Sequence, residues 1–238
     1  MMDAVSVDRS LIRPGGLRAP WTSRAVSPGC GESPARVLDF FFLSHFFSPY
    51  EMNPETGRPR LKQGAFQIYT GEGKGKSTAS MGLALRALGC GFRVYYLRMM
   101  KPRWKTGELA ICPTLHPNLT YKNVEQDWIL SKSKNIPEHV TAMRAALCQV
   151  IDELERLMVS SEYDLVIVDE INYCIHRNLI PLERAIALVE KRPENVELVF
   201  TGRYAPEALI ERPGVVTEMR KIKHHFDNGV PARRGIEF

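Results

Sequence analysis

Residues 65–78 join a short β-rich run to a glycine-rich turn, and this turn ends in Gly-Lys-Ser. Gly71, Gly73 and Gly75 allow the backbone to curl, so that successive N–H groups point into one concavity. A helix that begins near Lys76 adds the partial positive charge of its N-terminus. The segment therefore predicts a strand–loop–helix unit that binds the phosphates of a nucleoside triphosphate.

The loop departs at one position from the usual phosphate-loop pattern, G-x-x-x-x-G-K-[ST], because Thr70 stands in place of the first glycine. Lys76 can reach terminal phosphates, and the Ser77 hydroxyl can hold Mg²⁺. A glycine-rich turn with a chance Gly-Lys-Ser is the alternative, but the flanking strand and helix argue against it. The residues predicted to bind the nucleotide are Thr70, Gly71, Glu72, Gly73, Lys74, Gly75, Lys76, Ser77 and Thr78.

Strand and helix patterns alternate along the rest of the chain. Apolar runs predict strands at 66–70, 93–98, 164–169, 196–200 and 215–219. Helical spacing predicts helices over 76–89, over 140–157 and from Pro181 onward. This alternation predicts an α/β fold with a doubly wound, mostly parallel sheet of the P-loop NTPase type. The polar stretch from Lys101 to about Pro137 is expected to be irregular.

Residues 1–60 differ in composition from the rest of the chain. They are rich in Pro, Gly, Ser and Arg and lack helical or strand periodicity, which is typical of disordered or irregular segments. Met52 could serve as an alternative start of translation. We therefore expect residues 1–60 to form an N-terminal extension, disordered or not part of the mature protein, and residues 61–238 to form one domain.

Charge and cysteine content narrow the class of protein. The net charge of +5 suits small anions and nucleic acid equally, but no run of Lys and Arg is interleaved with aromatic residues as a nucleic-acid surface would require. The five cysteines are widely spaced and form no C-x-x-C pair, which argues against a disulfide framework or zinc site and favours reduced thiols in a cytoplasm. No stretch is long enough to span a membrane. We therefore expect a cytoplasmic protein without nucleic-acid or membrane partners.

Polar residues follow two further predicted strands. In an open parallel sheet, ligands bind beyond the carboxyl ends of the strands. An acid at such an end is the usual partner of a phosphate-loop Ser or Thr in holding Mg²⁺, so Ser77 with Asp169 or Glu170 forms a candidate metal site. A helix N-cap is the alternative for the acids. Arg203 is placed to meet a phosphate or carboxylate, or to form a surface ion pair.

Several segments, in order, resemble the ATP:corrinoid adenosyltransferase family over residues 64–238. They are Tyr69–Thr78, Gly82–Gly89, Lys101, Trp104, Gly107, Glu108, Asp169–Tyr173, Thr201–Arg203, Val216–Glu218, Lys223–His224, Phe226–Asp227, Gly229 and Gly235–Phe238. The resemblance implies a homodimeric cytoplasmic enzyme that transfers the 5′-deoxyadenosyl group of ATP to Co(I) of a corrinoid and releases triphosphate. Such an enzyme serves adenosylcobalamin biosynthesis or salvage, with Mg²⁺ or Mn²⁺ as cofactor and an electron donor that reduces the cobalt.

The resemblance also assigns roles to single residues. Co(I) is already a strong nucleophile, so catalysis would come from positioning and from neutralising the departing triphosphate. Lys76 and Arg203 are the expected catalytic residues, and Ser77 and Glu170 the implied metal ligands. Trp128 matches an aromatic that packs against the corrinoid in some members. Ordinary packing is the alternative for Trp128, because a Gln occupies the position of its partner aromatic.

Two other functions stay open on the sequence alone. A P-loop kinase or NTPase would cleave the γ-phosphate, although no arginine-finger or acceptor-base pattern stands out. A non-catalytic module would bind nucleotide and corrinoid without turnover, although the intact set of Lys76, Ser77 and the two acids argues against it. The His224–His225 pair lacks further spaced ligands, so we expect it to form hydrogen bonds rather than bind a metal.

Overall fold

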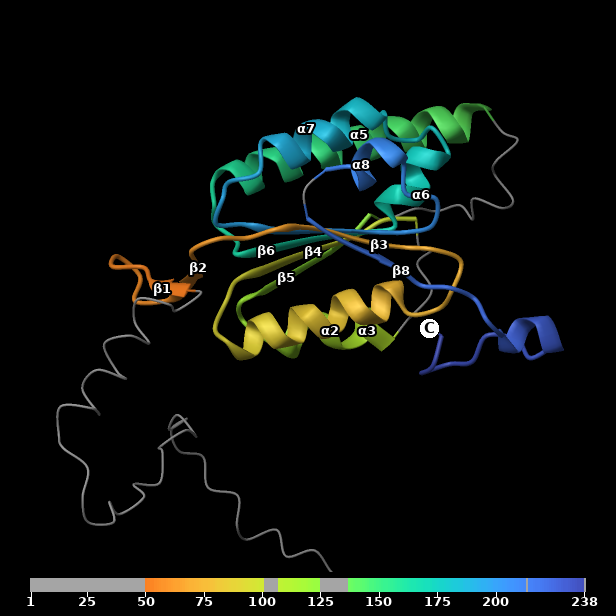
Figure 1. Ribbon diagram of the computed structural model, residues 1–238, viewed down its shortest axis with the longest axis horizontal. Coiled ribbons are helices and arrows are strands. Elements are labelled where there is room, and N and C mark those ends of the chain that lie inside the picture. The colour runs from red at the N-terminus through yellow and green to blue at the C-terminus, as the bar shows by residue number, and fades with distance from the viewer. Residues whose placement is uncertain (1–49, 101–106, 125–136, 213, 238) are drawn as a thin grey trace, which may run out of the picture. The chain divides into compact units, whose positions relative to one another are not determined.

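The computed structural model describes residues 50–100, 107–124, 137–212 and 214–237 (Figure 1). A six-stranded sheet lies at its centre in the order β5-β4-β6-β7-β3-β8, and its strand pairs are parallel. The strands are β3 (Phe66–Thr70), β4 (Val94–Arg98), β5 (Leu119–Asn123), β6 (Leu165–Asp169), β7 (Glu197–Thr201) and β8 (Val215–Glu218). The predicted α/β fold with a parallel sheet is confirmed.

Helices cover both faces of this sheet. One face carries α2 (Lys76–Gly89) and α3 (Gly107–Leu115) (Figure 1). The opposite face carries α5 (Pro137–Val159), α6 (Ile171–His176), α7 (Leu182–Glu190) and α8 (Glu207–Ile210). The central strands β4 and β6 are therefore buried along their whole length, which explains why their sequences are apolar or aromatic up to a final charged residue.

The long helix α5 shows how the sequence pattern becomes packing. Its buried side chains recur at spacings of three and four residues, which places them on one face of the helix. They are Met143, Leu147, Ile151, Leu154 and Met158. Full burial of each such side chain contributes about 1.5–3 kcal/mol. This packing fixes α5 against the strands whose carboxyl ends form the site.

The stretch between β4 and α5 was expected to be irregular, and this prediction was wrong for residues 107–123. Helix α3 contains Pro113, which interrupts the residue pattern of a helix. Strand β5 lies at the edge of the sheet and pairs with β4 alone, so it has a partly exposed, polar sequence instead of an apolar run.

A short hairpin precedes the first core strand. Strands β1 (Tyr50–Met52) and β2 (Pro59–Leu61) pair in antiparallel fashion. Between them, the Asn53 side-chain oxygen accepts from the backbone N–H groups of Glu55 and Thr56 at 2.9 and 3.0 Å. The expectation of irregular structure is thus wrong for these strands. Residues 1–49 lie outside the described part of the chain, so the extension stays a prediction there.

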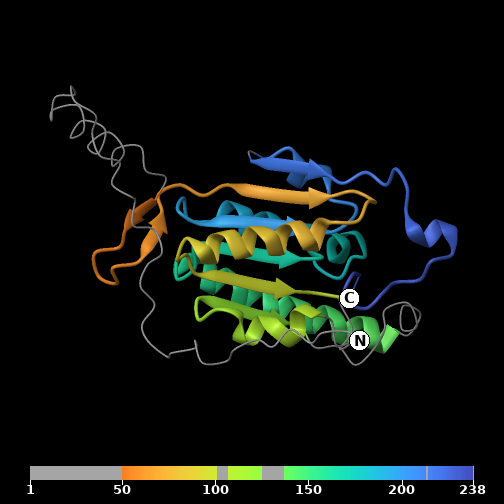
Figure 2. The same cartoon turned by 90° about the horizontal axis from the view of Figure 1, so that it is seen from below.

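The core strands all end at the same edge of the sheet, as the arrowheads in Figure 2 show. Beyond this edge lies the last part of the chain, residues 221–237, which we call the C-terminal segment; it contains the short helix η2 (His225–Asn228). Among the described residues, no helix has both the length and the apolar character needed to cross a membrane.

Candidate nucleotide site

The glycine-rich loop between β3 and α2 is held from behind by the chain that follows β8. Gly71 and Gly75 have φ angles of 95° and 122°, which glycine adopts at little cost. A Cβ at Gly73 would lie 2.6 Å from the carbonyl oxygen of Met219, so only glycine fits there. The Gly73 N–H donates to this carbonyl at 2.6 Å, and the Met219 N–H donates to the Thr70 carbonyl at 2.9 Å. The backbone of the curled loop is therefore held by hydrogen bonds to the chain that follows β8.

Lys76 holds the loop together from within. Its ammonium donates to the carbonyl oxygens of Gly71 and Gly73 at 2.6 and 2.7 Å, and its side chain is buried. Burial lowers the pKa of Lys76, and the positive charge of Arg203 lowers it further. The side chain is thus fixed in the loop, where it can exchange carbonyl oxygens for phosphate oxygens.

Asp169 at the end of β6 connects the loop to two other strands. The Ser77 hydroxyl donates to Asp169 Oδ1 at 2.8 Å, and the Thr201 hydroxyl donates to the same oxygen at 2.5 Å. Asp169 is only 1% exposed. Its carboxylate therefore orients the Ser77 side chain from behind and does not face the solvent.

Glu170 behaves differently from its neighbour. It lines the cavity in front of the loop and occupies the N-cap position of α6 with a left-handed φ of 71°. Its side chain makes no capping hydrogen bond, which removes the N-cap explanation for this acid. A strained backbone at such a place is typical of functional residues. Together with Ser77, Glu170 offers the oxygen donors that Mg²⁺ prefers.

The cavity in front of the loop has a volume of about 630 Å³, which lies within the usual range for small-molecule sites. One wall is polar and is formed by residues 72–78, Glu170 and Arg203. Another part of the lining is mostly apolar and comes from α3 and from later residues of α2. Its residues are Met81, Leu85, Ile111, Cys112 and Leu115. The cavity thus combines an anion-binding side with an apolar side, as a nucleotide requires.

Most of the predicted site residues meet at this cavity. Those that line it are Glu72, Gly73, Lys74, Gly75, Lys76, Ser77, Thr78, Glu170 and Arg203. The lining does not include Thr70, Gly71 and Asp169, whose hydrogen bonds instead hold the loop in place. The Thr70 hydroxyl, for example, accepts from the Ala205 N–H at 3.3 Å. Trp128, predicted to contact the corrinoid, lies outside the described residues.

Arg203 forms an ion pair across the mouth of the site. Its Nη1 lies 3.2 Å from Glu72 Oε2, and both side chains are about half exposed. Such exposed pairs contribute about 0–1 kcal/mol, so a phosphate can take the guanidinium from Glu72 at little cost. The two alternatives for Arg203, surface ion pair and phosphate contact, are therefore compatible.

Sequence reasoning missed the apolar wall from α3 and the contribution of the C-terminal segment. Ile111 and Leu115 stand four residues apart, a helical spacing that could have indicated the wall. Cys112 lies beside them, and burial raises the pKa of its thiol to about 11. On the C-terminal segment, His224 Nδ1 accepts from the Phe226 N–H at 3.2 Å, which confirms the hydrogen-bonding role predicted for this histidine.

A parallel sheet with a phosphate loop after its first core strand defines a P-loop nucleotide-binding protein. Residues 62–238 match the family described as ATP:corrinoid adenosyltransferase BtuR/CobO/CobP. The chain belongs to this family, and the enzyme class that the resemblance implied is confirmed.

Curated relatives agree with the family match. The corrinoid adenosyltransferase of Escherichia coli K12 is 31% identical over 177 residues, which cover 74% of this chain and 87% of the relative. That of Pseudomonas aeruginosa is 28% identical over 190 residues, which cover 79% of this chain and 90% of the relative. Domain III of DnaA from Thermotoga maritima covers 79% of this chain and 63% of its own, with 11% identity and a TM-score of 0.32. This last likeness is too low to carry an argument.

Proposed function

We propose that this protein transfers the 5′-deoxyadenosyl group of ATP to Co(I) of a corrinoid and releases triphosphate, in adenosylcobalamin biosynthesis or salvage. The observation that carries the proposal is the convergence of Lys76, Ser77 and Glu170 on one cavity of nucleotide size in a chain of this family. The residues that line this cavity supply cations and oxygen donors for the phosphates and an apolar wall for the rest of the nucleotide.

In the proposed reaction, reduced cobalt is a substrate. Co(I) attacks C5′ of ATP, a cobalt–carbon bond forms, the C5′–O5′ bond breaks, and its electron pair leaves with the triphosphate. The protein does not need to activate a nucleophile. Its part is to hold the two substrates in line and to stabilise the charge on the leaving group. The Lys76 ammonium and the Arg203 guanidinium are positively charged and line the cavity, so they can stabilise the charge on the triphosphate.

The site also fits a divalent cation. Ser77 and Glu170 would hold Mg²⁺ or Mn²⁺, since both present oxygen donors at the cavity. When bound, the ion would supply positive charge to the triphosphate. Asp169 would contribute indirectly, because its hydrogen bond from the Ser77 hydroxyl at 2.8 Å orients this donor.

Four further parts of the proposal rest on the family resemblance. They are a homodimeric state, a cytoplasmic location, an electron donor that reduces the cobalt, and a corrinoid contact at Trp128. Both cob(I)alamin and cob(I)yrinic acid a,c-diamide are corrinoid substrates of the proposed reaction.

The direct test is incubation of the full chain with ATP, Mg²⁺ and chemically reduced cobalamin. We expect the optical spectrum to change to that of a cobalt–carbon product, and we expect no change without ATP. Hydrolysis of ATP with no alkylated cobalt, at any Mg²⁺ concentration, would contradict the proposal and favour a P-loop NTPase. Binding of both substrates without turnover would favour a non-catalytic module.

A further inference from the structure

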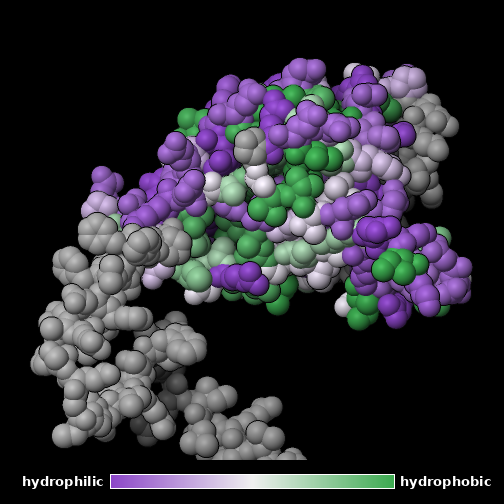
Figure 3. Space-filling view, in the orientation of Figure 1, coloured by the Kyte–Doolittle hydropathy of each residue, from purple (hydrophilic) through white to green (hydrophobic). Residues whose placement is uncertain are grey.

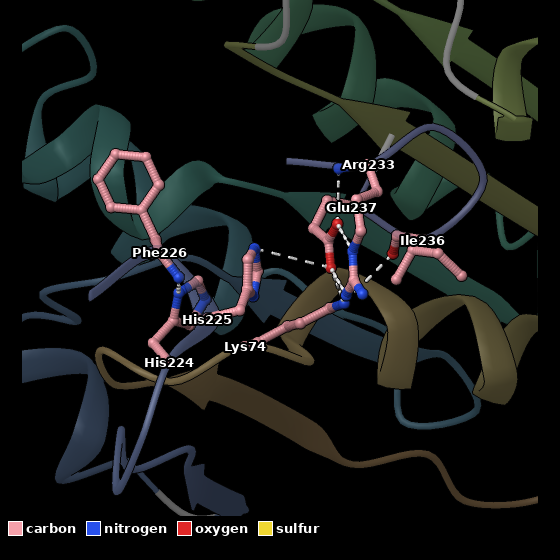
Figure 4. Close-up of polar contacts among 7 residues, drawn as sticks. All are labelled: Lys74, His224, His225, Phe226, Arg233, Ile236 and Glu237. Carbon is pink, nitrogen blue, oxygen red and sulfur yellow. Dashed lines mark hydrogen bonds and ion pairs between the residues drawn. The ribbon is translucent and has the colours of Figure 1, made fainter. Parts of the chain in front are cut away.

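Among the described residues, one side chain makes the hydrogen bonds that join the C-terminal segment to the phosphate loop. Lys74 Nζ donates to the carbonyl oxygen of Ile236 at 3.3 Å and to Glu237 Oε1 at 2.7 Å (Figure 4). Within the described ranges, the other hydrogen bonds of residues 221–237 join members of the segment to each other. The segment's hydrogen bonds to the phosphate loop therefore all depend on one ammonium group.

Glu237 places a carboxylate among cations at this contact. Its Oε1 lies 2.7 Å from Lys74 Nζ, 3.1 Å from Arg233 Nη2 and 3.9 Å from His225 Nε2. Hydrogen bonds from Arg233 and Lys74 hold the pKa of Glu237 well below its ordinary value. The carboxylate therefore stays anionic over the pH range in which such a protein works.

This carboxylate lies in the cavity in front of the phosphate loop. Lys74 belongs to the phosphate loop, and Lys74 and Glu237 both line the cavity that contains Lys76. A triphosphate brings several negative charges to the same place, and phosphate oxygens bind ammonium groups strongly. A triphosphate in this cavity would therefore compete with Glu237 for Lys74, and the two anions would repel each other.

Apolar packing does little to retain the segment. Ile222 is 91% exposed and Phe226 is 68% exposed. Figure 3 shows hydrophobic side chains among hydrophilic ones on the surface of this part of the molecule. The polar contacts of Lys74 with Glu237 and with the Ile236 carbonyl are therefore the main described contacts between the segment and the loop. The Lys74 side chain is 43% exposed and that of Glu237 is 12% exposed, so water and a ligand anion can reach the pair from the side of the ammonium.

We propose that Glu237 is an internal counter-anion of the phosphate loop, which a bound triphosphate group displaces from Lys74. The C-terminal segment undocks when the nucleotide binds, and it docks again as triphosphate leaves, so that Glu237 assists product release. This inference requires polyphosphate binding at the loop. It does not depend on which group of the nucleotide is transferred, so it can fail while cobalt alkylation is observed.

The first test follows the segment in the full-length protein. Inorganic triphosphate with Mg²⁺ is the probe, and trypsin cleavage at the basic residues Lys221, Lys223, Arg233 and Arg234 is the readout. We expect saturating triphosphate to speed cleavage at these sites. Unchanged or slower cleavage would overturn the inference, because the segment would then stay docked or close over the ligand.

The second test measures triphosphate affinity by calorimetry. Glu237→Gln removes the competing charge, so we expect binding to become about two- to fivefold tighter, the range for loss of one exposed ion pair. Asp227→Asn is the matched control, because it removes one negative charge from the same segment but pairs with Lys221 and not with the loop. Unchanged or weaker binding by Glu237→Gln, or an equal gain in Asp227→Asn, would contradict the inference.

A double variant tests whether Glu237 acts through Lys74. In a Lys74→Met background there is no ammonium for which the carboxylate can compete. Glu237→Gln should therefore change triphosphate affinity less than about 1.5-fold in that background. If the full gain persists without Lys74, general electrostatic repulsion explains it and the proposed exchange is wrong.

Discussion

The phosphate loop and the C-terminal segment border the same cavity but are held in different ways. The loop is fixed by a backbone hydrogen bond from Gly73 to the Met219 carbonyl and by the buried Lys76 side chain, which donates to two carbonyls of the loop. The C-terminal segment is fixed to the loop by a side chain, Lys74, and exposes most of its apolar residues. A built-in loop can stabilise charge without rearranging, whereas a weakly held segment can move with each turnover.

Lys76→Ala should have the largest effect on activity, because it removes the buried cation of the phosphate loop. We expect adenosyl transfer to fall at least about a hundredfold, the size typical for one preorganised charge-stabilising group. Steady-state transfer to chemically reduced cobalamin measures the loss. Lys62→Ala is the control, since Lys62 is exposed and outside the cavity lining. Near-normal turnover in Lys76→Ala would show that the loop does not support the chemistry.

Glu170→Gln should shift the metal dependence, because Glu170 faces the cavity and Asp169 does not. We expect the Mg²⁺ concentration for half-maximal activity to rise about tenfold or more in Glu170→Gln, since ligand charge sets affinity for such ions. Asp169→Asn should shift it less and should lower the melting temperature, because a neutral amide oxygen accepts from the Ser77 and Thr201 hydroxyls more weakly than the carboxylate does. Mg²⁺ titrations and thermal melts of both variants test this. A larger metal shift in Asp169→Asn would reverse the assigned roles.

Gly73→Ala tests how rigidly the loop is held. Its added Cβ would lie 2.6 Å from the Met219 carbonyl oxygen, so we expect a loss of about 1–3 kcal/mol in the free energy of unfolding. Gly82→Ala in α2 is the control. Its Cβ would meet nothing within 4 Å, and the change should stabilise the protein by about 0.4–1 kcal/mol. Denaturant unfolding measures the stability of both variants. Equal stability would mean that the loop backbone shifts to accommodate the added Cβ and is not rigidly held.

Ile222→Ser should have the smallest effect. The side chain is 91% exposed, so we expect the free energy of unfolding to change by no more than about 0.5 kcal/mol. The same unfolding assay measures it. A clear loss of stability, or a change in oligomeric state, would show that another surface covers the C-terminal segment. The segment would then not be more weakly held than the phosphate loop.

The sequence predicted the phosphate loop well and the docking of the C-terminal segment poorly, for physical reasons. Strand β3, the glycine loop and helix α2 follow from local patterns: apolar residues, then glycines that permit positive φ, then helix formers. Likewise, the alternating pattern of strands and helices predicted the parallel sheet. These features are local, so they can be found in one chain.

Other features depend on contacts between distant parts of the chain. The pairing of Lys74 with Glu237 joins residues 163 positions apart, and no local pattern indicates it. The different environments of Asp169 and Glu170 could not be predicted either, because they depend on Ser77 and Thr201 in other elements. Strand β5 was missed because an edge strand does not need an apolar run.

The most direct test of the account is the fate of the phosphates of ATP. The full chain with ATP, Mg²⁺ and chemically reduced cobalamin should yield inorganic triphosphate in one-to-one ratio with the cobalt–carbon product, as measured by phosphorus NMR alongside the optical spectrum. Intact triphosphate is expected because the bond that breaks is C5′–O5′. ADP with inorganic phosphate as the main products, with cobalt unalkylated, would contradict it.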